Sequence, residues 1–245
     1  KAYFFQGTDG RIIFAIPYEQ DFTLIGTTDA EHEDADIKPS ITDAERDYLC
    51  AFASEYFERP VTPADVVWTY SGVRPLYDDG ASSATAATRD YVLALDDNGA
   101  PVLSVFGGKI TTYRKLAEQA LAKMGLGTAW TAGVAMPGGD FAVADVPKLR
   151  AKLVRDYAFL DEKWAARLIR AYGTEAWELL GDAKVAADLG RDFGATLTET
   201  ELRWMMSHEY AQTGEDALWR RSKLGLRLSA AQRTAVDDWM KEQAP

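Results

Sequence analysis

The stretch SVFGGKITTYRK, residues 104–115, has the composition of an anion-binding turn. An apolar run leads into Gly107 and Gly108, and Lys109 and two threonines then precede a helical pattern. Glycine lets the backbone come close to a ligand, and the first N–H groups of a helix carry positive partial charge. Lys109 would add a movable cation and Thr111 a hydroxyl. Strand-Gly-Gly-helix turns also arise for steric reasons alone, so this stretch leaves both interpretations open.

The same stretch is not a nucleotide-binding P-loop. That motif requires G-x-x-x-x-G-K-[ST], with its first glycine five positions before the second. Leu103 stands five positions before Gly108, and Ile110 occupies the Ser/Thr position that would bind magnesium. The dinucleotide fingerprint G-x-G-x-x-G is absent from the whole sequence. Any anion bound at this turn would therefore be held in another way.

Two arginines strengthen the case for an anion site. Arg74 stands in YSGVRPL, after an apolar run and before a proline, and Arg89 stands in TRDY. Guanidinium groups suit bidentate recognition of a carboxylate or a phosphate. The alternative is structural pairing of either arginine with Asp78, Asp79 or Asp90, and the residue chemistry leaves both possibilities open.

Other reactive residues give weaker signals. His32 and His208 are the only histidines and have no partner at metal-ligand spacing, so the sequence predicts no metal site. Cys50 is the only cysteine, which excludes an internal disulfide, and its helical pattern predicts a buried small side chain. The segment DALWRRSK, residues 216–223, predicts a packed helix with a basic edge or a contact surface.

Composition limits the class of protein. The chain has 245 residues, 47% of them apolar, and a formal net charge of −11. Overall acidity argues against nucleic-acid binding, which needs a basic face. No apolar run approaches the roughly 18 residues that span a bilayer. The sequence begins at Lys1 without an initiator methionine, and we expect a fragment or a processed product.

Sequence patterns divide the chain into a sheet-containing region and a helical region. Hairpins are expected at 11–28 and 90–106, and a strand at 66–76. Helices are expected from the Thr42–Glu45 capping box and from Ile110 to Gly125. Four further helices are expected in VPKLRAKLVRDYAFL, EKWAARLIRAYG, ETELRWMMSHEY and AAQRTAVDDWMKE.

Between the two regions, Pro137-Gly138-Gly139 is expected to form an interdomain turn, and β-rich runs disappear after about Val146. The predicted fold class is α+β, with an antiparallel or mixed sheet portion at 1–135 followed by an all-α domain at 136–245.

Five segments in order resemble the FAD-dependent glycerol-3-phosphate dehydrogenases of aerobic bacteria and mitochondria. They are RIIFAIPYEQDFTLIGTTD, DVVWTYSGVRPLYDD, TRDYVL, LSVFGGKITTYRKLAEQAL and DALWRRSKLGL. The resemblance covers essentially the whole chain and corresponds to the C-terminal half of such an enzyme. It implies an incomplete flavin-capping, substrate-domain sheet followed by a helical accessory domain. The N-terminal FAD-binding Rossmann part, with its glycine fingerprint and a histidine suited to act as base, is expected to be absent.

The resemblance also implies roles for particular residues. Arg74 and Arg89 would lie around the substrate phosphate and the flavin face, and Lys109 near the substrate, so all three are candidate catalytic and phosphate-binding residues. The turn would pack against the flavin of FAD through five residues: Gly107, Gly108, Lys109, Ile110 and Thr111. The turn is thus expected to close over a flavin.

The implied reaction is oxidation of sn-glycerol 3-phosphate to dihydroxyacetone phosphate, with electrons passed to a membrane quinone. Peripheral attachment to the inner, cytoplasmic face of the membrane follows from quinone use. The isolated chain is expected to be inactive, and an open apolar sheet face would favour self-association into a homodimer. Two alternatives remain: a non-catalytic module that contacts a partner or membrane, and a related oxidase that uses oxygen.

Overall fold

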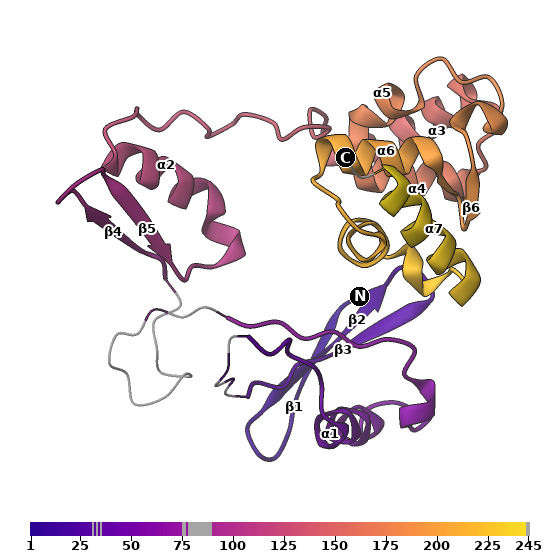
Figure 1. The fold of residues 1–245 in the computed structure, drawn as a ribbon. Coiled ribbons are helices and arrows are strands. Elements are labelled where there is room, and N and C mark those ends of the chain that lie inside the picture. Colours follow the sequence, from indigo (N-terminus) through magenta and orange to yellow (C-terminus); the bar gives the residue numbers. More distant parts are fainter. Residues whose placement is uncertain (31, 33, 35, 75–76, 78–89, 244–245) are drawn as a thin grey trace. The chain divides into compact units, whose positions relative to one another are not determined.

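The computed structural model describes residues 1–30, 32, 34, 36–74, 77 and 90–243 (Figure 1). The chain forms two compact units, Lys1–Val134 and Ala135–Pro245. Small antiparallel sheets and several helices make the architecture mixed α and β. We describe each unit by itself.

The first unit begins with a three-stranded antiparallel sheet. Its strands are β1 (Tyr3–Gln6), β2 (Ile12–Tyr18) and β3 (Phe22–Gly26), paired in the order β1-β2-β3. The β2–β3 pair confirms the hairpin predicted at 11–28. Alternate residues of the sheet face opposite sides, and Ile13 lies on the side that packs against α1 (Asp43–Ser54).

Helix α1 starts where its sequence predicts. The Thr42 hydroxyl accepts a hydrogen bond from the Glu45 N–H at 3.2 Å, and the Glu45 carboxylate accepts one from the Thr42 N–H at 2.9 Å. This reciprocal capping box satisfies N–H groups that have no partner within the helix. The buried face of α1 then carries Leu49, Cys50, Phe52 and Ala53, so the predicted burial of Cys50 is confirmed.

The second part of this unit is the hairpin and helix around the glycine turn. Strands β4 (Val92–Asp96) and β5 (Val102–Phe106) pair antiparallel, which confirms the second predicted hairpin. A 3₁₀ turn at Ile110–Thr112 leads into α2 (Tyr113–Lys123). Gly125, with φ of +70°, follows the end of α2, where the sequence predicts a stop.

The strand predicted at 66–76 is wrong for the residues that the structure describes. Residues 66–74 form no strand, and a short 3₁₀ turn at Pro63–Asp65 precedes them. β-rich composition gives a strand only where a partner strand supplies the ladder of hydrogen bonds. Within the described ranges, 66–74 has no such partner.

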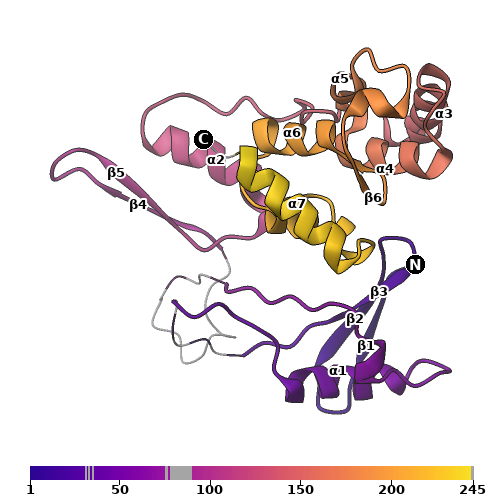
Figure 2. The ribbon, with the colours of Figure 1, turned by 45° about the vertical axis from the view of Figure 1, so that its right-hand side comes forward.

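The second unit is mainly helical (Figure 2). Its α-helices are α3 (Val146–Asp156), α4 (Glu162–Tyr172), α5 (Ala176–Leu180), α6 (Glu199–His208) and α7 (Ala230–Gln243), with a π-helix at Asp216–Arg221. These elements confirm the four helices expected after Val146. Buried side chains form two apolar clusters, one centred on α3 to α5 and the other on α6 and α7.

One expectation for this region is corrected. The domain is not all-α, because β6 (Asp192–Gly194) pairs with β7 (Leu197–Thr198). Strands of three and two residues are too short to show a period of two in the sequence.

Pro137-Gly138-Gly139 forms a turn, in which the Gly139 N–H donates to the Met136 carbonyl at 2.8 Å. In sequence it follows the boundary between the two units at Val134 and Ala135. A Cβ on Gly138 would lie 2.1 Å from the carbonyl oxygen of Tyr172, so this glycine packs closely against the end of α4.

Candidate functional site

The glycine turn after β5 adopts a backbone that favours glycine. Gly107 has φ of +67° and Gly108 has φ of +101°, which residues with side chains rarely adopt. A Cβ on Gly108 would lie 3.2 Å from the Cβ of Tyr91 and 3.4 Å from Leu116. The double glycine therefore has a steric role, since it lets the chain pass between the start of β4 and helix α2.

The residues after the glycines remain open to solvent. The Lys109 side chain is 54% exposed, and its Nζ lies 3.4 Å from Oδ1 of Asp90. Ile110 is 85% exposed, and Thr111 is also exposed. The Thr112 hydroxyl donates to the Lys109 carbonyl at 2.9 Å instead of capping the helix. Neither the 3₁₀ turn nor α2 has a side-chain cap at its start.

This arrangement fits an anionic, hydrogen-bond-accepting edge of a flat cofactor. The start of the 3₁₀ turn and α2 offers uncapped N–H groups and positive dipole character, with an exposed ammonium beside them. The backbone at the two glycines carries no side chain that would obstruct a ring. The pyrimidine edge of a flavin has the chemistry that these donors suit.

Arg74 has a carboxylate partner that the sequence does not indicate. Its Nη1 lies 3.2 Å from Oδ1 of Asp29, which follows β3, and both side chains are more than half exposed. An exposed pair of this kind contributes little to stability. The guanidinium therefore remains accessible for a second anion, and a bound phosphate would compete with Asp29 for it.

The structure gathers only part of the expected site. Asp90, one of three possible arginine partners in the sequence, lies 3.4 Å from Lys109, and its neighbour Tyr91 packs against Gly108. Arg89 lies outside the described residues. Within those residues, no contact joins Arg74 to Lys109. The candidate residues that the structure brings together are thus the Gly107–Thr111 turn, Asp90 and Tyr91.

A carboxylate that the sequence did not single out supports the helix behind the turn. Glu118 on α2 accepts hydrogen bonds from the N–H of Thr131 at 2.9 Å and from the Thr131 hydroxyl. Arg114 lies 3.1 Å from the same carboxylate. Hydrogen bonds from Thr131, and then the charge of Arg114, lower the pKa of Glu118. The contact ties the segment after α2 back onto that helix, and no local sequence pattern indicates it.

Each of the two histidines has a local contact of its own. Nε2 of His32 is 2.9 Å from the carbonyl oxygen of Ile37. The His208 ring stacks on Trp204, one turn earlier in α6, with centroids 3.8 Å apart. None of the helices described by the structure is both long enough and apolar enough to span a bilayer.

Comparison with protein families covers most of the chain. The FAD dependent oxidoreductase family matches residues 1–114, and the C-terminal domain of alpha-glycerophosphate oxidase matches residues 129–244. The first match corrects the expectation that the FAD-binding part is absent. Sequence belonging to the FAD-dependent oxidoreductase domain is present in residues 1–114, although it does not include a G-x-G-x-x-G fingerprint.

Individual relatives agree with the family matches. The aerobic glycerol-3-phosphate dehydrogenase of Escherichia coli strain K12 is 45% identical over 99% of this chain and 50% of its own length. The D-erythritol 1-phosphate dehydrogenase of Brucella abortus is 40% identical over 98% of this chain and 49% of its own length. The mitochondrial glycerol-3-phosphate dehydrogenase of Rattus norvegicus is 31% identical over 92% of this chain.

The chain spans about half the length of the bacterial relatives it matches. Its two family matches follow one another in sequence and leave only a short connection between them. The chain therefore belongs to the FAD-dependent oxidoreductases that carry the C-terminal domain of alpha-glycerophosphate oxidase.

Proposed function

We propose that this chain forms the C-terminal half of an FAD-dependent dehydrogenase that oxidises sn-glycerol 3-phosphate to dihydroxyacetone phosphate. One observation carries the proposal: 45% identity to a glycerol-3-phosphate dehydrogenase extends over 99% of the chain, including the glycine turn. Because the chain spans half of that relative, the activity is assigned to the complete flavoprotein that contains this chain. The chain alone is proposed to be inactive.

Bound FAD would accept the hydride, and the residues of this chain would bind the substrate and the flavin and hold them in the right orientation. The Gly107–Thr111 turn would lie against the flavin ring, with its uncapped N–H groups directed at the pyrimidine edge. Lys109 would hold the substrate close to the ring, and its charge would favour negative charge on the reduced cofactor. Breaking its 3.4 Å contact with Asp90 would free the ammonium for this role at small cost.

Arg74 and Arg89 are proposed to bind the substrate phosphate. Arg74 suits this role because it is half exposed and its partner Asp29 is itself 66% exposed, so a phosphate dianion can displace that carboxylate. The remainder of Lys1–Val134 would form the substrate-domain sheet, and Ala135–Pro245 a helical accessory domain. These roles rest on the resemblance and on the exposed cations.

The electron acceptor is proposed to be a membrane quinone, with the enzyme attached peripherally at the inner, cytoplasmic face. The alternative acceptor is oxygen, and one observation favours testing it: residues 129–244 match a domain of an oxidase. A non-catalytic interaction module is the second alternative. It predicts that the described helical unit binds its partner without any flavin chemistry.

The test is anaerobic addition of substrate to the complete flavoprotein, followed by visible absorption. Glycerol 3-phosphate should bleach the flavin band within seconds, and D-erythritol 1-phosphate should do so more slowly. A reversed preference would assign the chain to the activity named for the Brucella abortus relative. Re-oxidation by a soluble quinone, faster than by oxygen, would support the dehydrogenase; rapid peroxide formation would support the oxidase. No bleaching by either phosphate would contradict the proposal.

A further inference from the structure

The segment between Asp216 and Asp237 is basic in an otherwise acidic protein. It contains no carboxylate side chain and has five cations: Arg220, Arg221, Lys223, Arg227 and Arg233. The π-helix Asp216–Arg221 carries the first two of them. None of these residues has a part in the flavin chemistry proposed above.

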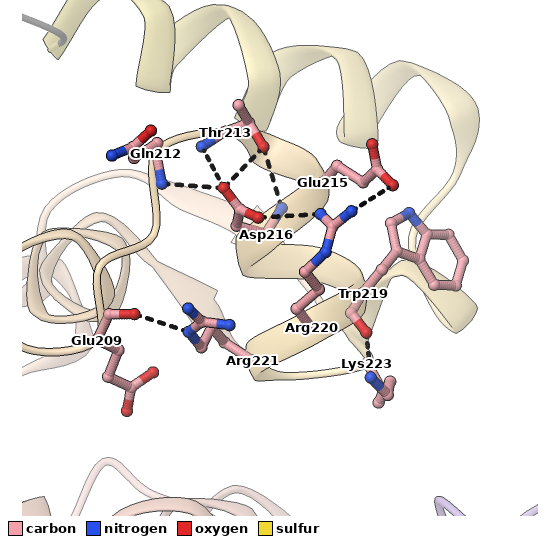
Figure 3. Close-up of polar contacts among 9 residues, drawn as sticks. All are labelled: Glu209, Gln212, Thr213, Glu215, Asp216, Trp219, Arg220, Arg221 and Lys223. Atoms are coloured by element: carbon pink, nitrogen blue, oxygen red, sulfur yellow. Dashed lines mark hydrogen bonds and ion pairs between the residues drawn. The ribbon is translucent and has the colours of Figure 1, made fainter. Parts of the chain in front are cut away.

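Two consecutive arginines on the π-helix have different environments (Figure 3). Both terminal nitrogens of Arg220 are paired, with Nη1 at 2.9 Å from Asp216 and Nη2 at 3.0 Å from Glu215. Arg221 is directed to the Glu209 backbone, where its Nε donates to the carbonyl oxygen at 2.8 Å. Within the described part of the chain, no hydrogen bond or ion pair engages the two terminal nitrogens of Arg221.

The π-helix explains why Arg220 and Arg221 have different environments. Ser222 donates its backbone N–H to the carbonyl of Ala217, five residues earlier, at 3.1 Å. Such a turn is wider than an α-helical turn, is rare, and occurs frequently at functional sites. Asp216 stabilises its start by accepting from the N–H groups of Gln212 and Thr213, each at 3.1 Å. The Arg221 guanidinium is thereby held in place at its Nε and exposed at its other end.

An exposed tyrosine adjoins the residue that holds Arg221. Tyr210 follows Glu209, and its side chain is 86% exposed. Its φ of +57° lies in the left-handed region, which is uncommon and strained for a bulky residue. The Ala211 N–H donates to the Met205 carbonyl at 3.1 Å, which helps to hold this backbone. The chain thus retains a strained backbone that leaves an aromatic ring in solvent.

The other cations of the segment are engaged. Lys223 donates to the Trp219 carbonyl, and Arg233 donates to the Gly225 carbonyl at 3.1 Å. Arg227 also has a partner. Arg221 leaves both terminal nitrogens of its guanidinium available to a ligand.

We propose that Glu209, Tyr210 and Arg221, here named the Tyr210 surface, dock an acidic segment of a partner protein. The free guanidinium fork would bind a carboxylate in bidentate fashion, and the tyrosine ring would pack against an apolar neighbour of that carboxylate. Tyrosine and arginine are the residues that dominate protein interfaces. An anionic membrane is disfavoured, because binding to anionic lipid relies on a cluster of cations. Arg220 is already paired with two carboxylates, which leaves one guanidinium fork suited to a single carboxylate.

The test uses the full chain and a fluorescein-labelled peptide of alternating glutamate and leucine, followed by anisotropy at low salt. Arg221→Gln should weaken peptide binding at least about tenfold. Arg221→Lys, which keeps the charge and loses the fork, should weaken it several-fold. Tyr210→Asn, which tolerates the left-handed backbone and removes the ring, should also weaken binding. Arg155→Gln on α3 removes the same charge from an exposed residue and should change affinity less than about twofold.

Melting temperatures of all variants are compared first, because Arg221 substitutions remove the bond to Glu209. If they unfold the unit, Tyr210→Asn still tests the surface, since it leaves that bond in place. If Arg221→Gln and Arg155→Gln weaken peptide binding equally, the peptide responds only to the net charge of the protein, and the proposal is overturned. No saturable binding of the peptide would overturn it too. So would binding to vesicles of anionic phospholipid that depends on Arg221 while peptide binding does not.

Discussion

Arg167 and Glu201 form a two-pronged ion pair within the helical unit. Nη1 and Nη2 of Arg167 lie 2.6 Å from Oε1 and Oε2 of Glu201, whose side chain is 1% exposed. The Tyr172 hydroxyl donates to the same carboxylate at 2.8 Å, and burial, followed by the charge of Glu201, raises the pKa of that tyrosine. The pair joins α4 to α6, so the two apolar clusters of this unit share a polar connection.

Removing one partner of this pair should destabilise the unit strongly. Glu201→Ala would remove the carboxylate that balances the Arg167 charge, although Arg167 would keep its bonds to Thr196, and it would leave the Tyr172 hydroxyl without its acceptor. We expect a loss of about 3–5 kcal/mol in unfolding free energy. The control is Arg203→Ala, because the 2.8 Å pair of Arg203 with Glu199 is exposed on the arginine side. That variant should lose about 1 kcal/mol or less. Denaturant unfolding of both variants measures the difference, and equal losses would contradict the account.

The capping box of α1 predicts a pH dependence. Hydrogen bonds from Thr28 and Thr42 lower the pKa of Glu45, so the folded state favours its carboxylate. The stability that Glu45 contributes should be present above the ordinary glutamate pKa and lost as pH falls through its lowered folded value. Glu45→Ala should cost about 1 kcal/mol at neutral pH and less in acid. A penalty that stays constant from pH 7 to pH 3 would show that the charge is not involved.

Glu209 should give the opposite pH dependence of stability to that of Glu45. Burial raises its pKa, and Arg221 opposes the shift only in part. The folded state then holds the proton more tightly than the unfolded state, so stability falls as pH rises from the ordinary glutamate value through the raised folded value. Glu209→Gln should remove this fall and melt higher than the parent at pH 7. Glu242→Gln, at the exposed end of α7, removes the same charge and should not. If the melting temperatures of the two variants change with pH in the same way, the prediction is contradicted.

The conformation of Gly108 makes a further prediction. Gly108→Ala introduces a Cβ at φ of +101° and at 3.2 Å from Tyr91, which should cost roughly 1–3 kcal/mol and displace the turn. Gly99→Ala, where a Cβ would meet nothing within 4 Å, is the control. In the complete flavoprotein the first variant should release FAD more readily, as measured by flavin fluorescence on dilution. If the Gly108 variant retains FAD as well as the Gly99 variant does, the turn does not contact the cofactor.

Local patterns predicted the elements that local contacts form. The Thr42–Glu45 box and the β2–β3 and β4–β5 hairpins involve residues close together in sequence, and the structure contains all three. The Arg167–Glu201 pair joins residues 34 apart, and no periodicity indicates it. Residues 66–74 were mispredicted for the same reason, because their composition suits a strand and pairing depends on a distant partner.

The candidate site was predictable to a similar extent. The sequence indicated the double glycine, and the structure gives both glycines positive φ values. Spacing along the sequence could not predict that Arg74 pairs with Asp29 or Lys109 with Asp90. An exposed, long side chain can reach several nearby carboxylates, so its partner depends on the folded structure. The roles of Arg74, Arg89 and Lys109 in binding remain predictions.

The most direct test of the central claim is the kcat/KM for glycerol 3-phosphate of a Lys109→Gln variant in the complete flavoprotein, compared with Lys115→Gln. Lys109 is half exposed with one long ionic contact, so the substitution should leave the melting temperature unchanged. If the Gly107–Thr111 turn lies at the flavin and substrate, Lys109→Gln should lower kcat/KM about 30- to 100-fold, equivalent to about 2–3 kcal/mol, and Lys115→Gln should not. Equal kcat/KM values for the two variants would contradict the assignment of this turn to the active site.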